Sequence, residues 1–317
     1  MVILKSTLCV SLKSLVLILT GKSLPANMAA ETNKEEKMLR RILIPFDPSP
    51  YAAAALEYAC FLAKRQNAEV TGVVVLDIPG IEKSIGPMPL GGIYYASMLE
   101  KTKEKKAHEH IQTLLGKFRE KCQKEGVAHR EAELQGSPSE QILHDSIYYD
   151  LVVMGMRTHF HFETEHKPGD SIERIFSHAS TPFLTVPEHF QPKEKINVLI
   201  AFNGSPPAVR ALQGFTHLFE ASAFETEITL LMSESDAILA KFHLDGASAY
   251  LKAHSFHNVK IEQISQDILQ AMEEKYLPWA DLVVLGVHSK KGLLDFMLGS
   301  LSRYLIKVGT KPLLFGQ

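Results

Sequence analysis

The stretch Arg41–Ala52, which reads RILIPFDPSPYA, decides the fold, because a nearly continuous apolar run leads into an Ala- and Leu-rich helix that continues to Arg65. Such a run is typical of a parallel strand that is covered on both faces. The stretch Asn197–Ala208, NVLIAFNGSPPA, shares Leu, Ile, Phe, Ser, Pro and Ala with it at matching positions. The chain therefore contains an internal repeat, and each copy opens with a strand and a helix.

A second repeated stretch places the fourth strand of each copy. Asp150–Gly155, DLVVMG, matches Asp281–Gly286, DLVVLG, in all but one position. Because the order of the matched segments is kept, we interpret the repeat as a tandem duplication. The expected strands are Arg41–Phe46, Glu69–Leu76, Arg130–Leu134, Leu151–Met154 and Phe183–Val186 in copy one, and Val198–Phe202, Ile228–Met232, Val259–Gln263, Leu282–Leu285 and Leu313–Phe315 in copy two.

The alternation of strands and helices predicts an α/β fold of two tandem, doubly wound, open parallel five-stranded sheets. We expect a first domain over residues 38–190 and a second over residues 195–317, joined by the linker Gln191–Lys195. One further helix start is expected at Ser137, where Pro138 follows the N-cap and Glu140 completes a capping box.

Residues 1–37 are expected to be a leader outside both copies. Their apolar part is broken by Lys5 and Lys13 and is too short for a membrane-spanning helix. A signal peptide and a translation start at Met28 or Met38 are both open alternatives. We favour a dispensable leader and a cytoplasmic protein.

Composition limits the class of protein. Among 317 residues, 45% are hydrophobic and 22% are charged, which are ordinary globular values. Lys plus Arg is 34 and Asp plus Glu is 36, for a net charge of -2, which argues against nonspecific nucleic-acid binding. Three cysteines without a C-x-x-C pair exclude a disulfide framework and a zinc knuckle, so Cys60 and Cys122 are expected as small buried residues.

Two loops of each copy could bind a ligand, because ligands of open parallel sheets bind at the carboxyl ends of the strands. One loop follows the first strand, at Asp47–Pro50 and Asn203–Pro206. The other follows the fourth strand, and in copy two it ends at Gly299 and Ser300, which open a helix. Glycine and the free N–H groups of a helix start suit a phosphate, although an ordinary tight turn and cap fit the same pattern.

An Asp after the first strand and the Gly-x2-Gly-x9-Gly-Ser type of spacing after the fourth resemble the universal stress protein (UspA) family. Two copies in one chain look like its tandem members, and the similarity runs from about Met38 to Gln317. The resemblance implies a nucleotide-binding-like α/β fold, a cytoplasmic stress-response role, and ATP or AMP binding in some members. It also implies dimer formation, here between the two copies around a pseudo-two-fold axis, with Phe183–Val186 and Leu313–Phe315 at the seam.

Carried over residue by residue, the resemblance leaves copy one with a degraded motif. Thr158 stands where the second Gly is expected, and Asp170 replaces the Ser, which places a negative charge where a phosphate would bind. Asp47 falls near the ribose and Val75 near the adenine. The first-copy candidates are Asp47, Val75, Gly155 and Gly169.

Copy two keeps the nine-residue spacing and the Gly-Ser pair, but Asn203 replaces the Asp and Ser289 the second Gly. His288 could supply charge near the phosphates. An adenine nucleotide is therefore expected in copy two if either copy binds one. The second-copy candidates are Asn203, Gly286, His288, Ser289, Gly299, Ser300 and Leu301.

The sequence contains no P-loop, no Gly-x-Ser-x-Gly elbow and no His-Glu-x-x-His, so no catalytic residue is assigned. His159, His161 and Glu163 could share a face and bind a metal, but a polar surface loop explains them as well, and no metal is assigned. We expect a non-enzymatic stress-response module. An interaction scaffold with decayed nucleotide sites and an ATP-hydrolysing enzyme are the alternatives. The expected partners are an adenine nucleotide and either a second chain, in a homodimer, or the other copy, with neither nucleic acid nor membrane.

Overall fold

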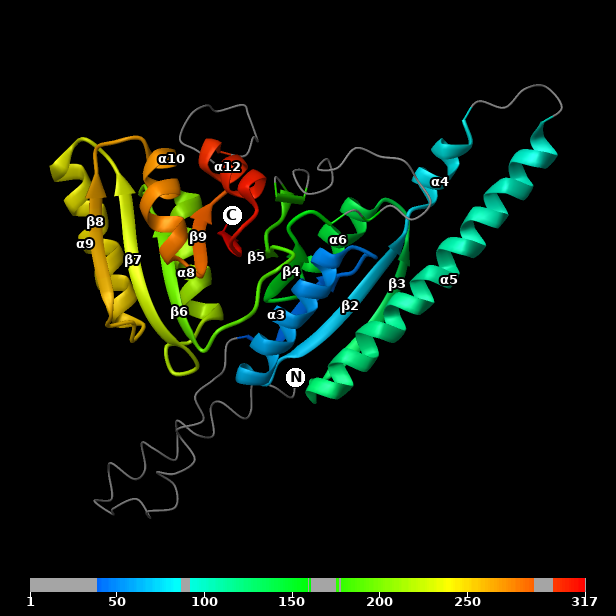
Figure 1. Ribbon diagram of the computed structural model, residues 1–317, viewed down its shortest axis with the longest axis horizontal. Helices are drawn as coiled ribbons and strands as arrows, with labels where there is room; N and C mark the ends of the chain where they lie inside the picture. The colour runs from blue at the N-terminus through cyan, green and yellow to red at the C-terminus, as the bar shows by residue number, and fades with distance from the viewer. Residues whose placement is uncertain are drawn as a thin grey trace, which may run out of the picture. The chain divides into compact units, whose positions relative to one another are not determined.

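The computed structural model describes residues 39–86, 92–158, 160, 175–176, 178–287 and 299–316, and within this part the α/β fold is confirmed. Residues 38–317 form one compact unit (Figure 1). Copy one comprises β1 (Arg41–Pro45), α3 (Pro50–Gln66), β2 (Glu69–Leu76), α4 (Ile78–Ile85), α5 (Ile93–Glu125), β3 (His129–Gln135), α6 (Pro138–Ser146), β4 (Leu151–Gly155) and β5 (Phe183–Val186). Copy two comprises β6 (Lys195–Ala201), α8 (Pro206–Leu218), β7 (Glu225–Ser233), α9 (Ala237–Ala253), β8 (Val259–Ile264), α10 (Ile268–Ala271), the π-helix η1 (Met272–Tyr276), α11 (Leu277–Trp279), β9 (Leu282–Gly286), α12 (Ser300–Val308) and β10 (Leu313–Gly316).

The sheet has the strand order β3-β2-β1-β4-β5-β10-β9-β6-β7-β8, so the two copies have the same topology. All neighbouring strands are parallel except β5 and β10, which pair antiparallel with Phe315 opposite Phe183. The predicted seam is therefore confirmed. The two five-stranded halves are not separate sheets, however, because the backbone groups at the edges of β5 and β10 bond to each other and produce one ten-stranded sheet.

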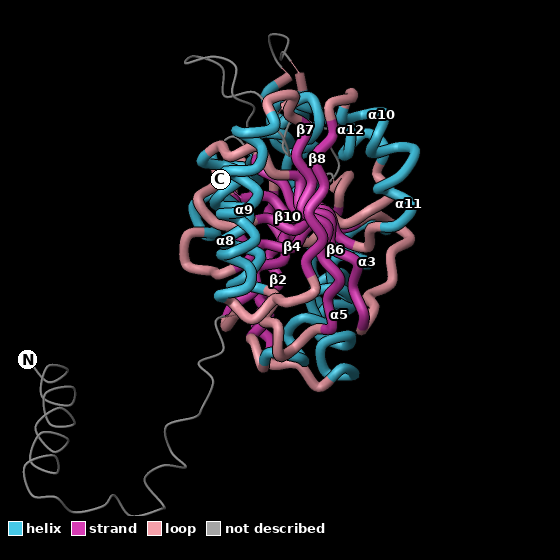
Figure 2. Tube along the Cα trace, turned by 90° about the vertical axis from the view of Figure 1, so that its left-hand side faces the viewer, coloured by secondary structure: helices cyan, strands magenta, loops and turns pink. Residues whose placement is uncertain are grey.

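Helices cover both faces of the sheet, as expected because its inner parallel strands, such as β4 and β9, are apolar throughout. Figure 2 shows the strands between α8 and α9 on one side and α10 and α12 on the other. Alternate strand residues serve the two faces: Ile42 and Ile44 pack under α3 and α5, and Leu43 belongs to the core on the opposite face.

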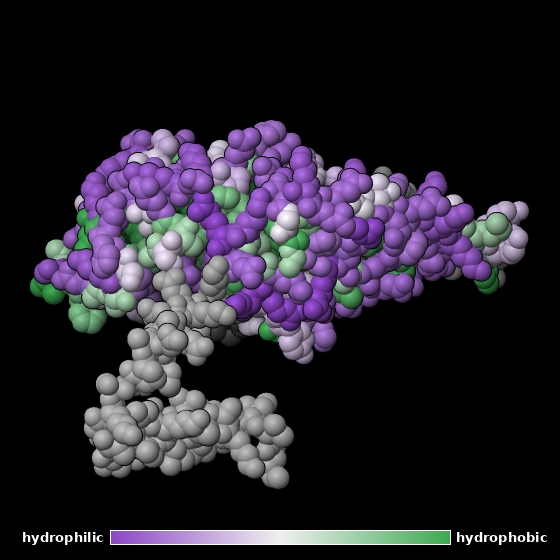
Figure 3. All heavy atoms as spheres, turned by 90° about the horizontal axis from the view of Figure 1, so that it is seen from below, coloured by the Kyte–Doolittle hydropathy of each residue, from purple (hydrophilic) through white to green (hydrophobic). Residues whose placement is uncertain are grey.

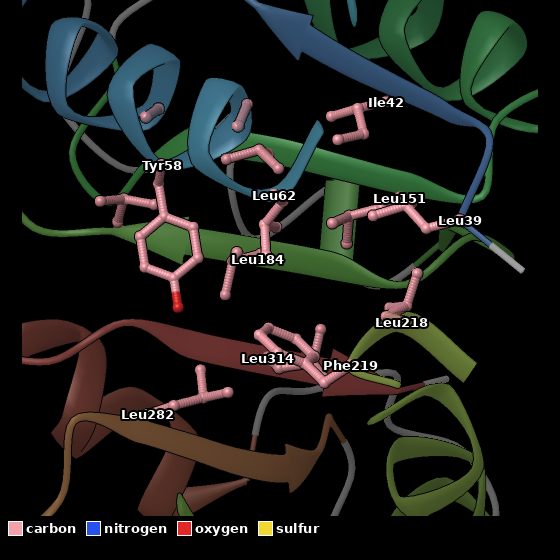
Figure 4. Packing of buried hydrophobic residues seen from close by; sticks show 14 of the residues in the cluster. Leu39, Ile42, Tyr58, Leu62, Leu151, Leu184, Leu218, Phe219, Leu282 and Leu314 are labelled. Carbon is pink, nitrogen blue, oxygen red and sulfur yellow. The ribbon is translucent and has the colours of Figure 1, made fainter. Parts of the chain in front are cut away.

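The seam is a packed core as well as a strand pair. Leu184 of β5 and Leu314 of β10 lie in one hydrophobic cluster across it, and Tyr58 of α3 points toward it (Figure 4). On the other face, the rings of Phe176 and Phe315 lie 4.6 Å apart. Burial of these groups couples the two copies energetically.

Two helix starts differ from the sequence-based expectation. Ser137 is the N-cap of α6, but the predicted capping box is wrong, because no side chain caps that helix and the Ser137 hydroxyl lies 3.5 Å from the Ser139 hydroxyl instead. Helix α4 was not among the elements expected from the sequence. Pro79 is tolerated in the first turn, and the carboxylate of Asp77 accepts a hydrogen bond from the Gly80 N–H at 3.0 Å.

An ionic cluster ties β8 to the π-helix η1. Lys260, Lys275 and Tyr276 all bind the carboxylate of Glu262, whose side chain is 13% exposed. Burial opposes ionisation of this group, but the three hydrogen bonds outweigh it and lower the pKa of Glu262 to about 2. The carboxylate therefore stabilises the native state at neutral pH.

Helix α5 is buried along only part of its length. Its buried residues lie between Ala107 and Cys122, where it packs on β2 and β3. Its first two turns expose a group of hydrophobic residues, and Figure 3 shows apolar atoms at the corresponding end of a largely hydrophilic surface. These residues are Ile93, Tyr94, Tyr95, Met98 and Leu99. No helix in the described ranges is long and apolar enough to cross a membrane.

Candidate functional site

A cavity of about 240 Å³ lies at the carboxyl ends of β6, β7 and β9 in copy two. Strand β6 lies between β9 and β7. The connection after β6 leads to β7 on one side, and the later connection after β8 leads to β9 on the other side, so a crevice opens at this switch point. The volume is slightly below the range of ~300–1,000 Å³ typical of ligand pockets. The residues around the cavity are Ala201, Phe202, Asn203, Ser205, Ala208, Leu231, Ser233, Ile268, Leu285, Gly286, Gly299, Ser300, Leu301 and Ser302. The cavity thus brings together five of the seven predicted second-copy residues.

Asn203 forms the turn between β6 and α8. Its Oδ1 accepts hydrogen bonds from the Ser205 N–H at 3.0 Å and from the Ser205 hydroxyl at 2.6 Å. The hydroxyl in turn caps α8 by accepting from the Ala208 N–H at 3.4 Å. With the carbonyl oxygen used in the turn, the amide nitrogen of Asn203 has no partner in the described part of the chain, so it is a donor available to a ligand in the cavity.

The start of α12 provides the strongest anion-binding feature of the cavity. Gly299 is the N-cap and has no side chain that could cap the helix, and the N–H groups of Ser300 and Leu301, which have no intrahelical acceptor, find no partner among the described residues. The Gly299 N–H donates to the Val287 carbonyl at 3.1 Å, which fixes the helix start beside β9. Free N–H groups and the positive end of the helix dipole both favour a negative group here.

The backbone angles do not explain the glycine at 299. Its φ is −59°, a value that any residue adopts. What glycine contributes here is the absence of a side chain at a buried position that lines the cavity. Our expectation for Gly299 therefore rests on space for a ligand and not on backbone freedom.

Close packing explains why residue 286 is a glycine, and the sequence alone did not reveal this. A Cβ atom there would lie 2.6 Å from the Ala208 nitrogen and 2.8 Å from the Pro207 carbonyl carbon. Glycine thus allows the first turn of α8 to approach the end of β9, and this contact closes the side of the cavity. Gly155 plays the same part in copy one, where a Cβ would lie 2.8 Å from the Tyr51 carbonyl carbon.

The end of the cavity formed by β7 was missed by the sequence comparison. The N–H groups of Phe46 and Phe202 bond to the carbonyls of Val73 and Leu231, so Leu231 corresponds to Val73. Ser233, two residues further along β7, therefore corresponds to Val75. Both Leu231 and Ser233 line the cavity, and Ile268 of α10 adds an apolar side chain. A comparison by strand register, which needs the structure, identifies these positions.

Copy one keeps the same turn after its first strand, and after its fourth strand Thr158 bonds back to Gly155. Asp47 is 1% exposed, and its Oδ1 accepts from the Ser49 N–H at 3.2 Å and the Ser49 hydroxyl at 2.6 Å, as Asn203 does in copy two. The Thr158 hydroxyl donates to the Gly155 carbonyl at 2.8 Å and lies against Gly155. Val75 is buried in the core, as are Met156 and Phe160 from the loop after β4.

Three of the predicted residues, Gly169, His288 and Ser289, lie outside the described residues, as do His159, His161 and Glu163 of the candidate metal loop. In the part of the chain that the structure describes, no group of three or more His, Cys, Asp or Glu side chains is arranged to hold a metal ion.

Comparison with known proteins gives the same family for this arrangement. Residues 38–187 match the model of the universal stress protein family. The chain is 21% identical over 300 residues to the universal stress protein Slr1230 of Synechocystis sp. (strain ATCC 27184 / PCC 6803 / Kazusa), with 87% of this chain and 99% of that protein covered.

Two solved structures share the fold across both copies. A universal stress protein from Archaeoglobus fulgidus DSM 4304 has a TM-score of 0.60 at 18% identity, covering 88% of this chain and 98% of that one. The functionally unknown protein PA1789 from Pseudomonas aeruginosa PAO1 has a TM-score of 0.57 at 14% identity, covering 87% and 92%. The tandem arrangement of this chain is therefore also found in chains of similar length.

Proposed function

This chain belongs to the universal stress protein family as a tandem member, and we propose that it is a stress-response module that binds one adenine nucleotide, in copy two. The observation that carries the proposal is the cavity at the switch point of copy two, which has an apolar end at Leu231 and Ile268 and an uncapped helix start at Ser300. An apolar slot beside an anion-binding helix start fits a purine base joined to a phosphate.

The positions in the cavity suggest how the nucleotide lies. The base packs between Leu231 and Ile268, with the hydroxyl of Ser233 at its edge. The sugar faces the amide of Asn203, and the phosphates face the N–H groups of Ser300 and Leu301. Because Asn203 is neutral where copy one has Asp47, copy two does not repel the phosphates from this side.

We propose that copy one does not bind a nucleotide. Asp47 keeps a carboxylate at the turn, and Thr158 folds back on Gly155 beside the loop. The stoichiometry that follows is one nucleotide per chain.

Among the described residues, the side chains around the cavity are apolar, amide or hydroxyl groups. Such groups bind a nucleotide well but transfer protons weakly at neutral pH. We therefore propose a binding role, in which the nucleotide changes the surface that a partner meets, in preference to ATP hydrolysis. A cytoplasmic location stays a prediction.

The pairing of β5 with β10 supports an intramolecular version of the expected dimer. The strand edge that would pair with a second chain in a homodimer already pairs with the other copy, through the bonds between β5 and β10. We propose that the chain is a monomer with respect to this seam, which sedimentation equilibrium tests. A stable two-chain species that persists on dilution would favour the homodimer instead.

The nucleotide is tested directly by denaturing the purified full chain and identifying released small molecules by mass spectrometry, followed by calorimetry with ATP, ADP and AMP. Ile268→Trp should fill the cavity and abolish binding, whereas Gln270→Trp adds the same ring to the exposed side of the same helix and should bind normally. A measured stoichiometry near one supports the proposal. The absence of binding heat at millimolar nucleotide would favour the interaction scaffold, and turnover with magnesium would favour the enzyme.

A further inference from the structure

The two cysteines of copy one, far apart in sequence, meet in the core. Cys60 on α3 and Cys122 on α5 have their sulfur atoms 4.0 Å apart, and their residues are 2% and 0% exposed. Sequence analysis predicted each to be a small buried residue, and burial is confirmed for both. Their proximity gives them a chemistry that buried alanines would not have.

The helices that carry the two thiols are already packed together. Helix α3 contacts α5 directly, and beside the thiols Lys64 of α3 pairs with Glu125 of α5 at 2.7 Å. A disulfide needs a sulfur separation of about 2.05 Å, so forming the bond requires the two sulfur atoms to move about 2 Å closer together.

The surroundings favour reaction at Cys60. The hydrogen bond from the Cys122 thiol lowers the pKa of Cys60, burial opposes this, and the positive charge of Lys121 adds to the lowering. Lys121 also pairs with Glu125 of its own helix, with 3.1 Å between the Lys121 nitrogen and the Glu125 carboxylate. The same carboxylate pairs at 2.7 Å with Lys64 of α3 and so joins the two helices beside the thiols. The side chains of these ion pairs are partly exposed, and ion pairs near the surface contribute little to stability. We infer that a small oxidant reaches the buried thiols when these ion pairs open.

We propose that Cys60 and Cys122 are a redox site that forms a reversible disulfide between α3 and α5 when the protein meets hydrogen peroxide. The Cys60 thiolate attacks one oxygen of the peroxide, which forms a sulfenic acid and releases hydroxide. The sulfur of Cys122 then attacks the Cys60 sulfur and displaces water, with its thiol proton completing the balance. Two thiols are oxidised and one peroxide is reduced to two waters; a small dithiol reverses the change by exchange.

The bond would fix the anchored part of α5. Cys122 is the last buried residue of that helix, and the helix is buried only between Ala107 and Cys122. A covalent tie at this end removes motions in which α5 separates from α3 (Figure 1). The site lies in copy one, so it is independent of the nucleotide proposed for copy two.

The experiment treats the folded, reduced full chain with hydrogen peroxide and then counts thiols after unfolding in guanidinium. We expect the three thiols of the chain to fall to one, the intact mass to fall by that of two hydrogen atoms, and peptide mapping to recover a Cys60–Cys122 cross-link. Dithiothreitol should restore all three thiols. The oxidised protein should melt several degrees higher than the reduced one.

Matched variants separate this site from other thiol chemistry. Cys9→Ser should still form the bond, whereas Cys60→Ala and Cys122→Ala should each fail to form it within one chain. The proposal is overturned if the folded wild type keeps three thiols, if the cross-link contains Cys9, or if Cys60 gains two oxygen atoms and remains unlinked. The wild-type measurement decides the matter even if an alanine variant folds poorly.

Discussion

A negative charge at the start of α12 should weaken phosphate binding in proportion to the charge of the ligand. Ser300→Asp is the sharpest change, because Ser300 is the first residue of this helix, is exposed, and lines the cavity. At a separation of ~6 Å and an effective dielectric constant of ~40, two unit charges repel by about 1.4 kcal/mol, or about tenfold in Kd. The carboxylate should also stabilise the helix by about 0.5 kcal/mol through its dipole, so the fold should not suffer.

Calorimetry with three ligands measures this effect. Adenosine carries no phosphate, so its Kd should change by less than about twofold, whereas AMP and ATP should each bind at least about tenfold more weakly. Ser300→Asn is the matched control, because it has nearly the same shape as Asp without the charge, and it should bind all three ligands as the wild type does. If adenosine weakens as much as ATP, the substitution has deformed the cavity. If AMP binds Ser300→Asp normally, the phosphate does not lie at α12 and the proposed orientation is wrong.

Three further predictions concern stability. Gly286→Ala should destabilise the protein by about 1–3 kcal/mol because its Cβ would meet the α8 backbone at 2.6 Å, whereas Gly116→Ala, in an open helical position, should be neutral or stabilising in denaturant unfolding. Phe315→Ala should cost about 3–5 kcal/mol, since its fully buried ring joins the two copies, and a small loss would show that the seam adds little. Glu262→Gln should lower the free energy of unfolding by about 1–2 kcal/mol at pH 7. Because the native pKa of Glu262 lies near 2, below its unfolded value, this difference from wild type should shrink as the pH falls from about 4.5 toward 2. A difference in unfolding free energy that stays constant with pH would refute the ionic account.

The inner strands could be predicted from sequence because they are buried on both faces. In β4 and β9 every buried residue is apolar, so a continuous run marks the strand without any alternation. Helix α4 escaped prediction because its stability comes from a cap at Asp77 and from packing on α5, and neither is visible in a sequence that contains Pro79 and Gly80. The apolar pattern of the sequence thus predicts elements that are held by burial, and it misses an element such as α4 that depends on a cap and on contact with another helix.

The site could be predicted only where its residues are local in sequence. Asn203 follows the first strand of copy two and the Gly299-Ser300 pair ends the loop after the fourth, so the repeat alone assigns them to one sheet edge. Ser233 was missed because β7 is shifted by two residues relative to the simple alignment of the copies, and only the bond from Phe202 to Leu231 reveals it. The pairing of Cys60 with Cys122 depends on helix packing, which no spacing in the sequence encodes.

The two copies differ in the side chains at their candidate sites, because a duplicated chain can change one copy while the other keeps its original residues. Their first turns keep the same bonds, because Asp47 and Asn203 both hold the serine that caps the next helix, and a helix start must be satisfied in either copy. The amide serves this purpose as well as the carboxylate does, so the charge is free to change in one copy. After the fourth strand, the Thr158 hydroxyl of copy one donates to the Gly155 carbonyl, and in copy two Gly299 starts α12 beside the cavity. The N–H groups of a helix start favour an anion, and copy two combines such a start with the neutral side chain of Asn203 in one cavity, which is why we place the nucleotide in copy two.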